Sequence, residues 1–152
     1  MVKNILSTSR YKTLIMNGLE QIVLNRVQCK ECGEILTSYH RHDYVKCSCP
    51  NQTMTDGGQD YHRYGGQDMS KIDLSLTVYQ TDDHDIMRKA VYWGTYGKAG
   101  DEPRRWVHVA DMSNDHLTNC INHFSGRIAP MIEKTMADEL EYRTQNNITI
   151  TD

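Results

Sequence analysis

The sequence predicts an α+β fold, in which a zinc-ribbon-like module and a small antiparallel β-sheet pack on one or two C-terminal helices. Three observations predict it: two close cysteine pairs between residues 29 and 49, alternating apolar residues along 72–80, and an apolar stripe with helical spacing from residue 117 to residue 140. We expect residues 1–70 to hold the module and residues 71–152 the sheet and helices, folded together as one compact unit.

The first half of the chain is predicted to contain a strand, the metal module and a loop. Residues 1–18 are ambiguous, because Gly18 interrupts an otherwise helical spacing. Residues 19–28 have a β-branched core and are predicted as a strand. The spacer 34–46 has the length of a β-hairpin between the two cysteine pairs, and residues 51–70, rich in Gly, Asp, Gln and Asn, are predicted as loop.

Strands continue into the second half of the chain. The alternation of Ile72, Leu74, Leu76 and Val78 predicts a strand over 72–80 with one buried face. Residues 86–96 and 105–110 flank a turn-rich segment and are predicted as two strands joined by a long hairpin loop. A helical turn over residues 85–90 is the alternative for the start of the first of these strands.

The periodicity then becomes helical. Ser113 is the expected N-cap, and the sequence around Gly126 and Pro130 predicts that the helical stripe is kinked or broken into two helices. Cys120 lies on the stripe and is assigned to the core. The last eight residues are expected to fray. Met131 and Met136 on the stripe suit a partner helix as well as an intrachain sheet, which leaves a homodimer open.

Charge and hydropathy exclude several classes of protein. The 152 residues carry a formal net charge of −3, whereas generic nucleic-acid binders have a basic excess that neutralises phosphates, so generic nucleic-acid binding is not expected. No apolar run approaches the roughly 20 residues that span a bilayer, and residues 1–6 do not resemble a signal peptide. We therefore expect a cytosolic protein without a membrane segment, in which clustered cysteines are metal ligands more often than disulfides.

The cysteine pairs predict a structural zinc site. Cys29 and Cys32 form a Cys-x-x-Cys-Gly turn, and Cys47 and Cys49 follow after a spacer. Four thiolates suit tetrahedral Zn²⁺ and leave no open position for a reacting water, so the metal is expected to be structural. Two alternatives stay open: the thiols are unliganded or form a redox pair, or His40 or His42 replaces one sulfur of the tighter second pair.

Polar segments flank the second cysteine pair, at residues 39–44 and 56–66. They combine imidazole, guanidinium and carboxylate groups with glycines, a mixture that can hold a phosphate or a nucleotide. The alternative, which we favour, is that Asp56 and the glycines form tight turns while the tyrosines pack over the module. The candidate binding residues under the first interpretation are Arg41, Arg63, Tyr64, Arg105 and Trp106.

Three sequence blocks occur in a specific order. They are Cys29-Lys-Glu-Cys-Gly-Glu-Ile-Leu, His40-Arg-His-Asp-Tyr-Val-Lys-Cys-Ser-Cys and Asp56-Gly-Gly-Gln-Asp-Tyr-His-Arg-Tyr-Gly-Gly. Over about residues 22–66 the chain resembles a family of small uncharacterised bacteriophage and prophage proteins that carry a domain of unknown function. The chain departs from that pattern at Pro50, where a glycine is usual. The resemblance implies a phage source and a zinc-ribbon-like fold, and it implies no activity.

Three functions follow as hypotheses. The first is a non-enzymatic phage accessory protein that binds and inhibits, in the host cytoplasm, a host protein of antiviral defence. The second is a nucleotide-binding module that sequesters a defence signal, and the third is a zinc-ribbon protein directed at nucleic acid. No complete catalytic set is recognised, because the single His-x-Thr at residues 116–118 lacks the second pair that a two-histidine phosphoesterase needs.

Overall fold

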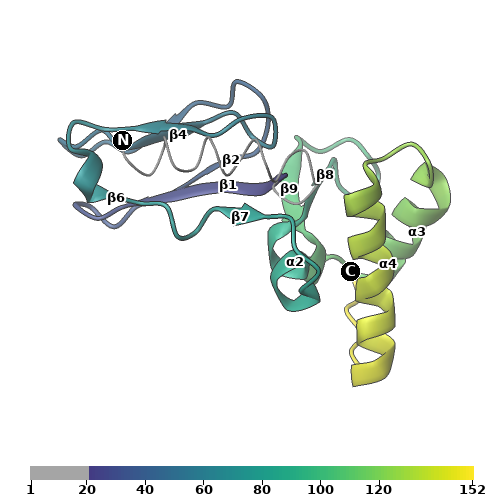
Figure 1. Cartoon of the computed structure of the whole chain (residues 1–152). Helices are drawn as coiled ribbons and strands as arrows, with labels where there is room; N and C mark the ends of the chain where they lie inside the picture. The colour runs from purple at the N-terminus through teal and green to yellow at the C-terminus, as the bar shows by residue number, and fades with distance from the viewer. Residues whose placement is uncertain (1–20) are drawn as a thin grey trace. The chain divides into compact units, whose positions relative to one another are not determined.

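The chain divides into two compact units, Met1–Thr81 and Asp82–Asp152, here called the N-terminal and the C-terminal unit. The structure is a computed structural model that describes residues 21–152, and the ambiguous segment 1–18 lies outside the described residues (Figure 1). The predicted α+β class is confirmed, since small antiparallel sheets and α-helices make up the described part of the chain. None of its helices is long and apolar enough to cross a membrane.

A sheet around strand β1, Ile22–Cys29, forms the centre of the N-terminal unit. Its apolar, β-branched sequence suits a central strand, and most of its residues are buried, which confirms the strand predicted at 19–28 for the described part. Strand β2, Ile35–Ser38, pairs with β1 in antiparallel register, with Val27 opposite Leu36. β1 and β2 lie side by side in Figure 1.

The other edge of β1 is covered by two short strands where the sequence predicted one. Strands β6, Ile72–Asp73, and β7, Val78–Tyr79, both pair with β1. Between them a turn interrupts the alternation: the Thr77 backbone N–H donates to the Leu74 carbonyl at 3.2 Å. The Thr77 hydroxyl also donates to the Arg26 carbonyl at 2.7 Å, which bonds the turn back to β1.

A second sheet, of order β3-β4-β5, corrects two predictions. It consists of β3, Val45–Lys46, β4, Met54–Asp56, and β5, Arg63–Gly65, so the segment 51–70 predicted as loop contains two strands and a 3₁₀ turn, η1, Met69–Lys71. The expected hairpin within the spacer 34–46 is also wrong, because β2 pairs with β1 whereas β3 pairs with β4. Three-residue strands rich in polar side chains carry too little apolar alternation to be recognised.

The C-terminal unit begins with a helix where a strand was predicted. Helix α2, His84–Ala90, is capped by the Asp83 side chain, which accepts from the backbone N–H groups of Asp85 and Ile86. The prediction of a strand over 86–96 is therefore wrong for residues 86–90, and the alternative of a helical turn is correct. The hairpin itself is confirmed: β8, Tyr92–Thr95, pairs with β9, Arg105–His108.

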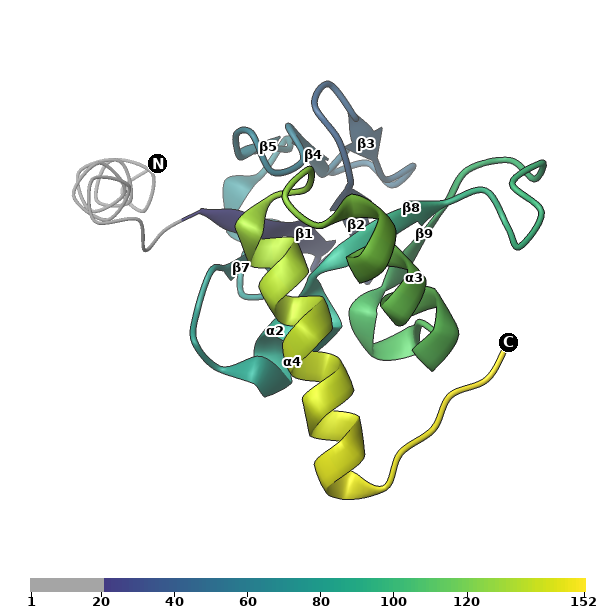
Figure 2. The same ribbon diagram turned by 90° about the vertical axis from the view of Figure 1, so that its right-hand side faces the viewer.

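Two helices follow the short 3₁₀ turn η2, Val109–Asp111. Helix α3, Asn114–Phe124, starts at the predicted cap, where the Ser113 hydroxyl accepts from the His116 N–H at 3.1 Å. The stripe is broken as predicted, and helix α4, Pro130–Asn146, begins at its proline. In Figure 2 α4 runs beside α2 and α3, and Cys120 is buried in this unit as expected.

A buried ionic cluster holds α4 in place. Glu139 is 0% exposed and accepts from Arg88, Arg143 and His84 at 2.8–2.9 Å. Arg143, 1% exposed, also donates to the backbone carbonyls of Met112 and Val109. The expectation of a fraying end is wrong over residues 148–150: the backbone N–H of residue 148 donates to the Arg143 carbonyl, and the N–H of residue 114 donates to the carbonyl of residue 150.

Candidate metal centre

Two hairpin turns bring the four cysteines of the pairs together. Cys29 ends β1, and the turn from residue 29 to residue 34, here the first knuckle, leads into β2. The Gly33 N–H donates to the Cys29 carbonyl at 2.7 Å, and the Cys29 N–H donates to the Glu34 carbonyl at 2.9 Å. Gly33 has a φ of +78°, in the left-handed region that favours glycine, which allows this tight reversal.

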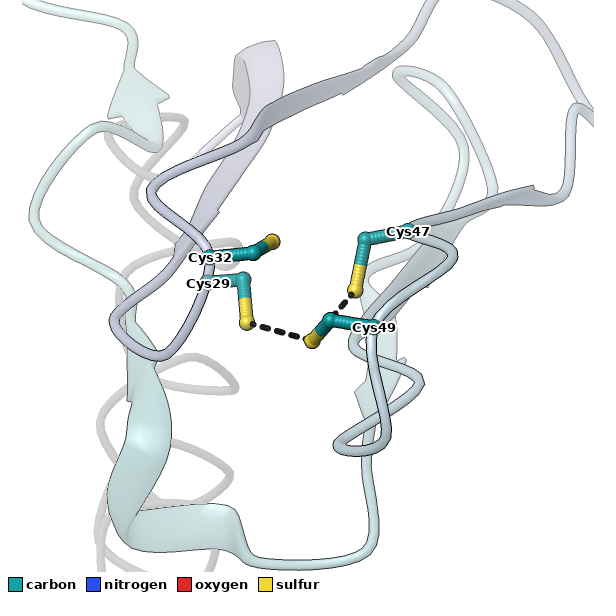
Figure 3. Close-up of side chains that lie close together, drawn as sticks. All are labelled: Cys29, Cys32, Cys47 and Cys49. Carbon is teal, nitrogen blue, oxygen red and sulfur yellow. Dashed lines mark hydrogen bonds between the residues drawn. The ribbon is translucent and has the colours of Figure 1, made fainter.

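The second knuckle, residues 47–53, joins β3 to β4. Here the Cys47 N–H donates to the Thr53 carbonyl and the Gln52 N–H donates to the Cys49 carbonyl, each at 2.9 Å. Gln52 takes the left-handed conformation, with a φ of +49°. Each cysteine pair therefore occupies the turn of its own hairpin, and the two turns face each other in Figure 3.

The sulfur positions fit a tetrahedral metal ion. The Sγ atoms of Cys29, Cys32, Cys47 and Cys49 all lie within 4.8 Å of one another. Cys49 Sγ lies 3.6 Å from Cys29 Sγ and 3.5 Å from Cys47 Sγ, close to the separation of about 3.8 Å that zinc–sulfur bonds of about 2.3 Å require in a tetrahedron. Among the described residues this is the one group of that kind, and neither His40 nor His42 belongs to it.

The site has a buried side and an exposed side. Cys29 and Cys47 are 0% and 1% exposed and pack with Val27, Leu36 and Ile72 in an apolar cluster, whereas Cys32 is exposed and Cys49 is partly buried. Apolar packing under two of the ligands fixes their positions independently of any metal. The ring of Tyr64 also packs against this cluster, which agrees with the structural interpretation of that tyrosine.

Hydrogen bonds favour the thiolate of Cys29. The Thr53 side chain lowers the pKa of Cys29 to about 6, with burial opposing and the backbone N–H groups of Cys32 and Glu31 assisting. For Cys49, burial is the largest effect and raises the pKa to about 12. Cys29 is therefore the ligand that ionises most readily, and metal binding at neutral pH must displace a proton from Cys49.

An ion pair lies at the rim of the site. Lys71 Nζ lies 3.2 Å from Glu31 Oε1, and the other carboxylate oxygen, Glu31 Oε2, lies 3.8 Å from Cys49 Sγ. Glu31 belongs to the first knuckle, and Lys71 belongs to the turn η1. A cationic side chain near four thiolates offsets part of their negative charge.

Behind the site, Asn25 connects the two sheets of the N-terminal unit. Its Nδ2 group donates to the carbonyls of Asp56, Gly58 and Tyr61 at 2.9–3.2 Å, and its Oδ1 accepts from the Thr55 hydroxyl at 2.5 Å. Asn25 is 0% exposed. Sequence reasoning missed this residue, although a polar side chain inside the apolar run of β1 is a signal that a buried partner exists.

Glycines at positions 57 and 58 allow the close approach of two loops. A Cβ on Gly57 would lie 2.0 Å from the Tyr61 carbonyl oxygen, and one on Gly58 would lie 2.6 Å from the His40 carbonyl carbon. The Gly58 N–H donates to the Ser38 hydroxyl at 3.0 Å. The glycines thus form the tight turns expected of them under the structural interpretation of residues 56–66.

A buried carboxylate lies next to exposed side chains in these loops. Asp56 is 1% exposed, and its Oδ2 accepts from Arg63 Nη2 at 2.6 Å and from the Tyr61 hydroxyl at 3.4 Å. The same hydroxyl lies 3.1 Å from Nδ1 of His42, whose φ of +64° is in the left-handed region. Asp56 Oδ1 is buried and has no hydrogen-bond partner within residues 21–152.

The candidate nucleotide-binding residues belong to two different units. Arg41 and Arg63 are exposed in the N-terminal unit. Arg105 and Trp106 lie on β9 in the C-terminal unit, where the guanidinium of Arg104 stacks 4.6 Å above the Trp106 ring. An arginine stacked on an aromatic ring is thus seen beside Trp106 in the C-terminal unit.

Comparison with known proteins places a family match over the four clustered cysteines. Residues 21–66 match the model of a domain of unknown function (DUF7695). No curated protein and no solved structure matches the chain. The match extends from the start of β1 to the glycines after β5, so it includes both knuckles and the Asn25 hydrogen bonds. It agrees with the resemblance at residues 22–66 to an uncharacterised family.

Proposed function

We propose that Cys29, Cys32, Cys47 and Cys49 bind one structural Zn²⁺ and that the chain is a non-enzymatic binding protein built on this centre. The observation that carries the proposal is the convergence of four sulfurs from two separate hairpins. Thiolate sulfur is a soft ligand, and four thiolates complete the tetrahedral coordination of zinc without leaving a position for water or substrate. The role of the metal is then to join the two knuckles.

The partner in this proposal is a host protein of antiviral defence, and the chain is a phage accessory factor that inhibits this partner in the host cytoplasm. Support comes from the resemblance of the three sequence blocks to phage and prophage proteins. The net charge of −3 supports a protein partner over generic nucleic-acid binding. Exposed apolar side chains next to the knuckles, Ile35 and Tyr44 with 52% and 53% exposure, supply contact area for a protein surface.

Purification of the tagged full chain from its host tests this function. Mass spectrometry of the purified sample identifies bound protein, nucleotide and metal together. One zinc per chain with one host protein in stoichiometric amount is the expected result. The matched control is a variant with Ile35→Ser and Tyr44→Ser, which should keep the zinc and lose the protein. A chain that keeps its zinc but carries no stoichiometric protein contradicts the partner assignment.

Nucleotide binding is the second candidate, favoured by the pairing of exposed Arg63 with buried Asp56. The ion pair positions the guanidinium at the surface, where it can form further hydrogen bonds to phosphate. Thermal stabilisation by a panel of linear and cyclic nucleotides tests this function. Stabilisation that is lost in Arg63→Ala and kept in Lys46→Ala, an exposed cation on β3, supports it. The absence of any shift across the panel contradicts it.

A nucleic-acid-directed role is the third candidate. Steeply salt-dependent binding of DNA or RNA by the full chain would favour it over the other two.

A further inference from the structure

The four sulfurs of the candidate metal centre differ in exposure to solvent. We propose that Cys32 is the primary site of oxidation by peroxides and that it then forms a disulfide with Cys49, with release of the metal. The proposal rests on the proposed zinc site and adds a reaction to it. It starts from the uneven burial of the four sulfurs.

Accessibility singles out Cys32. Cys29 and Cys47 lie in the apolar cluster with Val27 and Leu36, at 0% and 1% exposure, so an oxidant in solution does not reach them. Cys32 belongs to the exposed part of the first knuckle. Since thiolate oxidation follows thiolate character and exposure, a metal-bound thiolate at this position is the most reactive of the four.

Glu31 disfavours attack at the remaining partly exposed sulfur. One of its carboxylate oxygens lies 3.8 Å from Cys49 Sγ, and the other is paired with Lys71. The carboxylate occupies space next to this sulfur and repels the negative charge that develops on a departing hydroxide. Cys32 itself is exposed, and its sulfur interacts with the backbone N–H of Glu34 and with the other three cysteines of the cluster.

The reaction balances with hydrogen peroxide as the oxidant. The Cys32 thiolate attacks one peroxide oxygen, so an S–O bond forms, the O–O bond breaks and hydroxide leaves. The Cys49 thiolate then attacks the oxidised sulfur: an S–S bond forms, the S–O bond breaks and a second hydroxide leaves. Two electrons pass from the two sulfurs to the peroxide, and a metal ion that loses two of its four ligands is released.

Cys49 is the resolving cysteine because of its place in the other knuckle. Its sulfur lies within 4.8 Å of Cys32 Sγ, and a disulfide of about 2.05 Å needs only a further approach of the exposed first knuckle. The product joins the two knuckles covalently, so the link between the hairpins survives the loss of the metal. A disulfide between Cys29 and Cys32 would instead close within the first knuckle and leave the hairpins unlinked.

Peroxide titration of the zinc-loaded full chain tests the proposal. Zinc content is measured first, released zinc is followed with a metallochromic dye, and disulfides are mapped by mass spectrometry after remaining thiols are blocked. We expect release of about one zinc per peroxide consumed, with a Cys32–Cys49 disulfide as the product. Cys120→Ser is the matched control: Cys120 is buried at 3% exposure outside the cluster, so this variant should release zinc as the wild type does.

The outcomes separate this inference from the zinc assignment. A chain that contains no zinc before oxidation contradicts the proposed function, and this inference with it. A chain that holds one zinc and keeps it, with Cys32 unmodified, contradicts the inference alone. Initial oxidation of Cys29 or Cys47, or a disulfide within the first knuckle, overturns it as well. The mapping uses the wild-type chain, so the result does not depend on whether a Cys32→Ser variant folds.

Discussion

In the N-terminal unit, a single buried polar residue connects one β-sheet to the other. Asn25 lies on β1, whereas its partners lie on β4 and the following turn, so one amide links two sheets. A buried side chain that satisfies three carbonyls leaves several groups unpaired when it is removed, and each unpaired buried group costs about 1–3 kcal/mol. Stability of this unit should depend strongly on this residue.

Asn25→Ala should therefore lower the free energy of unfolding by at least about 3 kcal/mol, because the carbonyls of Asp56, Gly58 and Tyr61 lose their shared donor. Urea denaturation of the zinc-loaded chain measures this. Gln67→Ala, at an exposed position of the same unit, is the control and should change stability by less than about 0.5 kcal/mol. Equal effects of the two substitutions would contradict the role of Asn25.

His62 should make stability depend on pH. Burial lowers its pKa from 6.5 to about 4, so the folded state favours the neutral imidazole. The contribution of the neutral imidazole to the free energy of unfolding is fully present above pH 6.5. It is lost as pH falls from 6.5 towards 4, because the imidazole of the unfolded chain takes up a proton first. His62→Phe should flatten the decline in stability between pH 7 and pH 5, as measured by denaturation at both values. An identical decline in the two proteins would contradict this effect.

At the scale of elements, the sequence predicted the strands and helix ends that are determined by a local pattern of residue types. The strand β1, the β8–β9 hairpin, the Ser113 cap and the break before Pro130 follow from residue types and periodicity. Helix α2 was only the alternative to a strand, because its seven residues are too few for a helical stripe. The capping side chain of Asp83 was the local signal available for it.

Pairing between elements was harder to predict than the elements themselves. The two cysteine pairs were correctly grouped, yet the spacer strands β2 and β3 pair with β1 and β4 and not with each other. Chain length permits either arrangement. The buried contacts that each strand makes, such as Leu36 opposite Val27, determine which strands pair. Sequence spacing contains no information about such long-range partners.

Helix α4 depends on Glu139 for its packing. Burial raises the pKa of this carboxyl, but hydrogen bonds from Arg88, Arg143 and His84 outweigh it and lower the pKa to about 2. The carboxylate therefore stabilises the fold at pH values above 4.5, the ordinary pKa that the group has in the unfolded chain. This stabilisation is lost as pH falls towards 2.

Glu139→Gln should destabilise the C-terminal unit by about 3–5 kcal/mol, because it leaves the guanidinium groups of Arg88 and Arg143 without a counter-charge. Thermal and chemical denaturation followed by circular dichroism at 222 nm measure the loss of helix. Glu141→Gln, at an exposed position of the same helix, is the matched control and should be nearly neutral. A loss in Glu139→Gln no larger than in the control would contradict the role of the cluster.

At the scale of the whole molecule, the candidate metal centre and the α-helices belong to different units. The centre joins hairpins that are also held by Asn25 and by the apolar cluster around Val27 and Leu36. Loss of the metal should therefore loosen the two knuckles before it unfolds the rest. Nothing in the C-terminal unit, whose ionic cluster is internal, requires the metal.

Hydrogen–deuterium exchange with and without a zinc chelator should show this difference. We expect the amides of residues 29–34 and 47–53 to lose protection when zinc is removed, while α3 and α4 keep theirs. Uniform loss of protection across both units would mean that the metal supports the entire fold. Unchanged protection in the knuckles would mean that the sulfurs hold no structural ion.

Native mass spectrometry of the purified full chain tests the central claim most directly. The account predicts one zinc bound per chain, and loss of the ion in Cys29→Ser and Cys47→Ser but not in Cys120→Ser. Chains without metal under reducing conditions, or zinc retained at full occupancy in both knuckle variants, would contradict it.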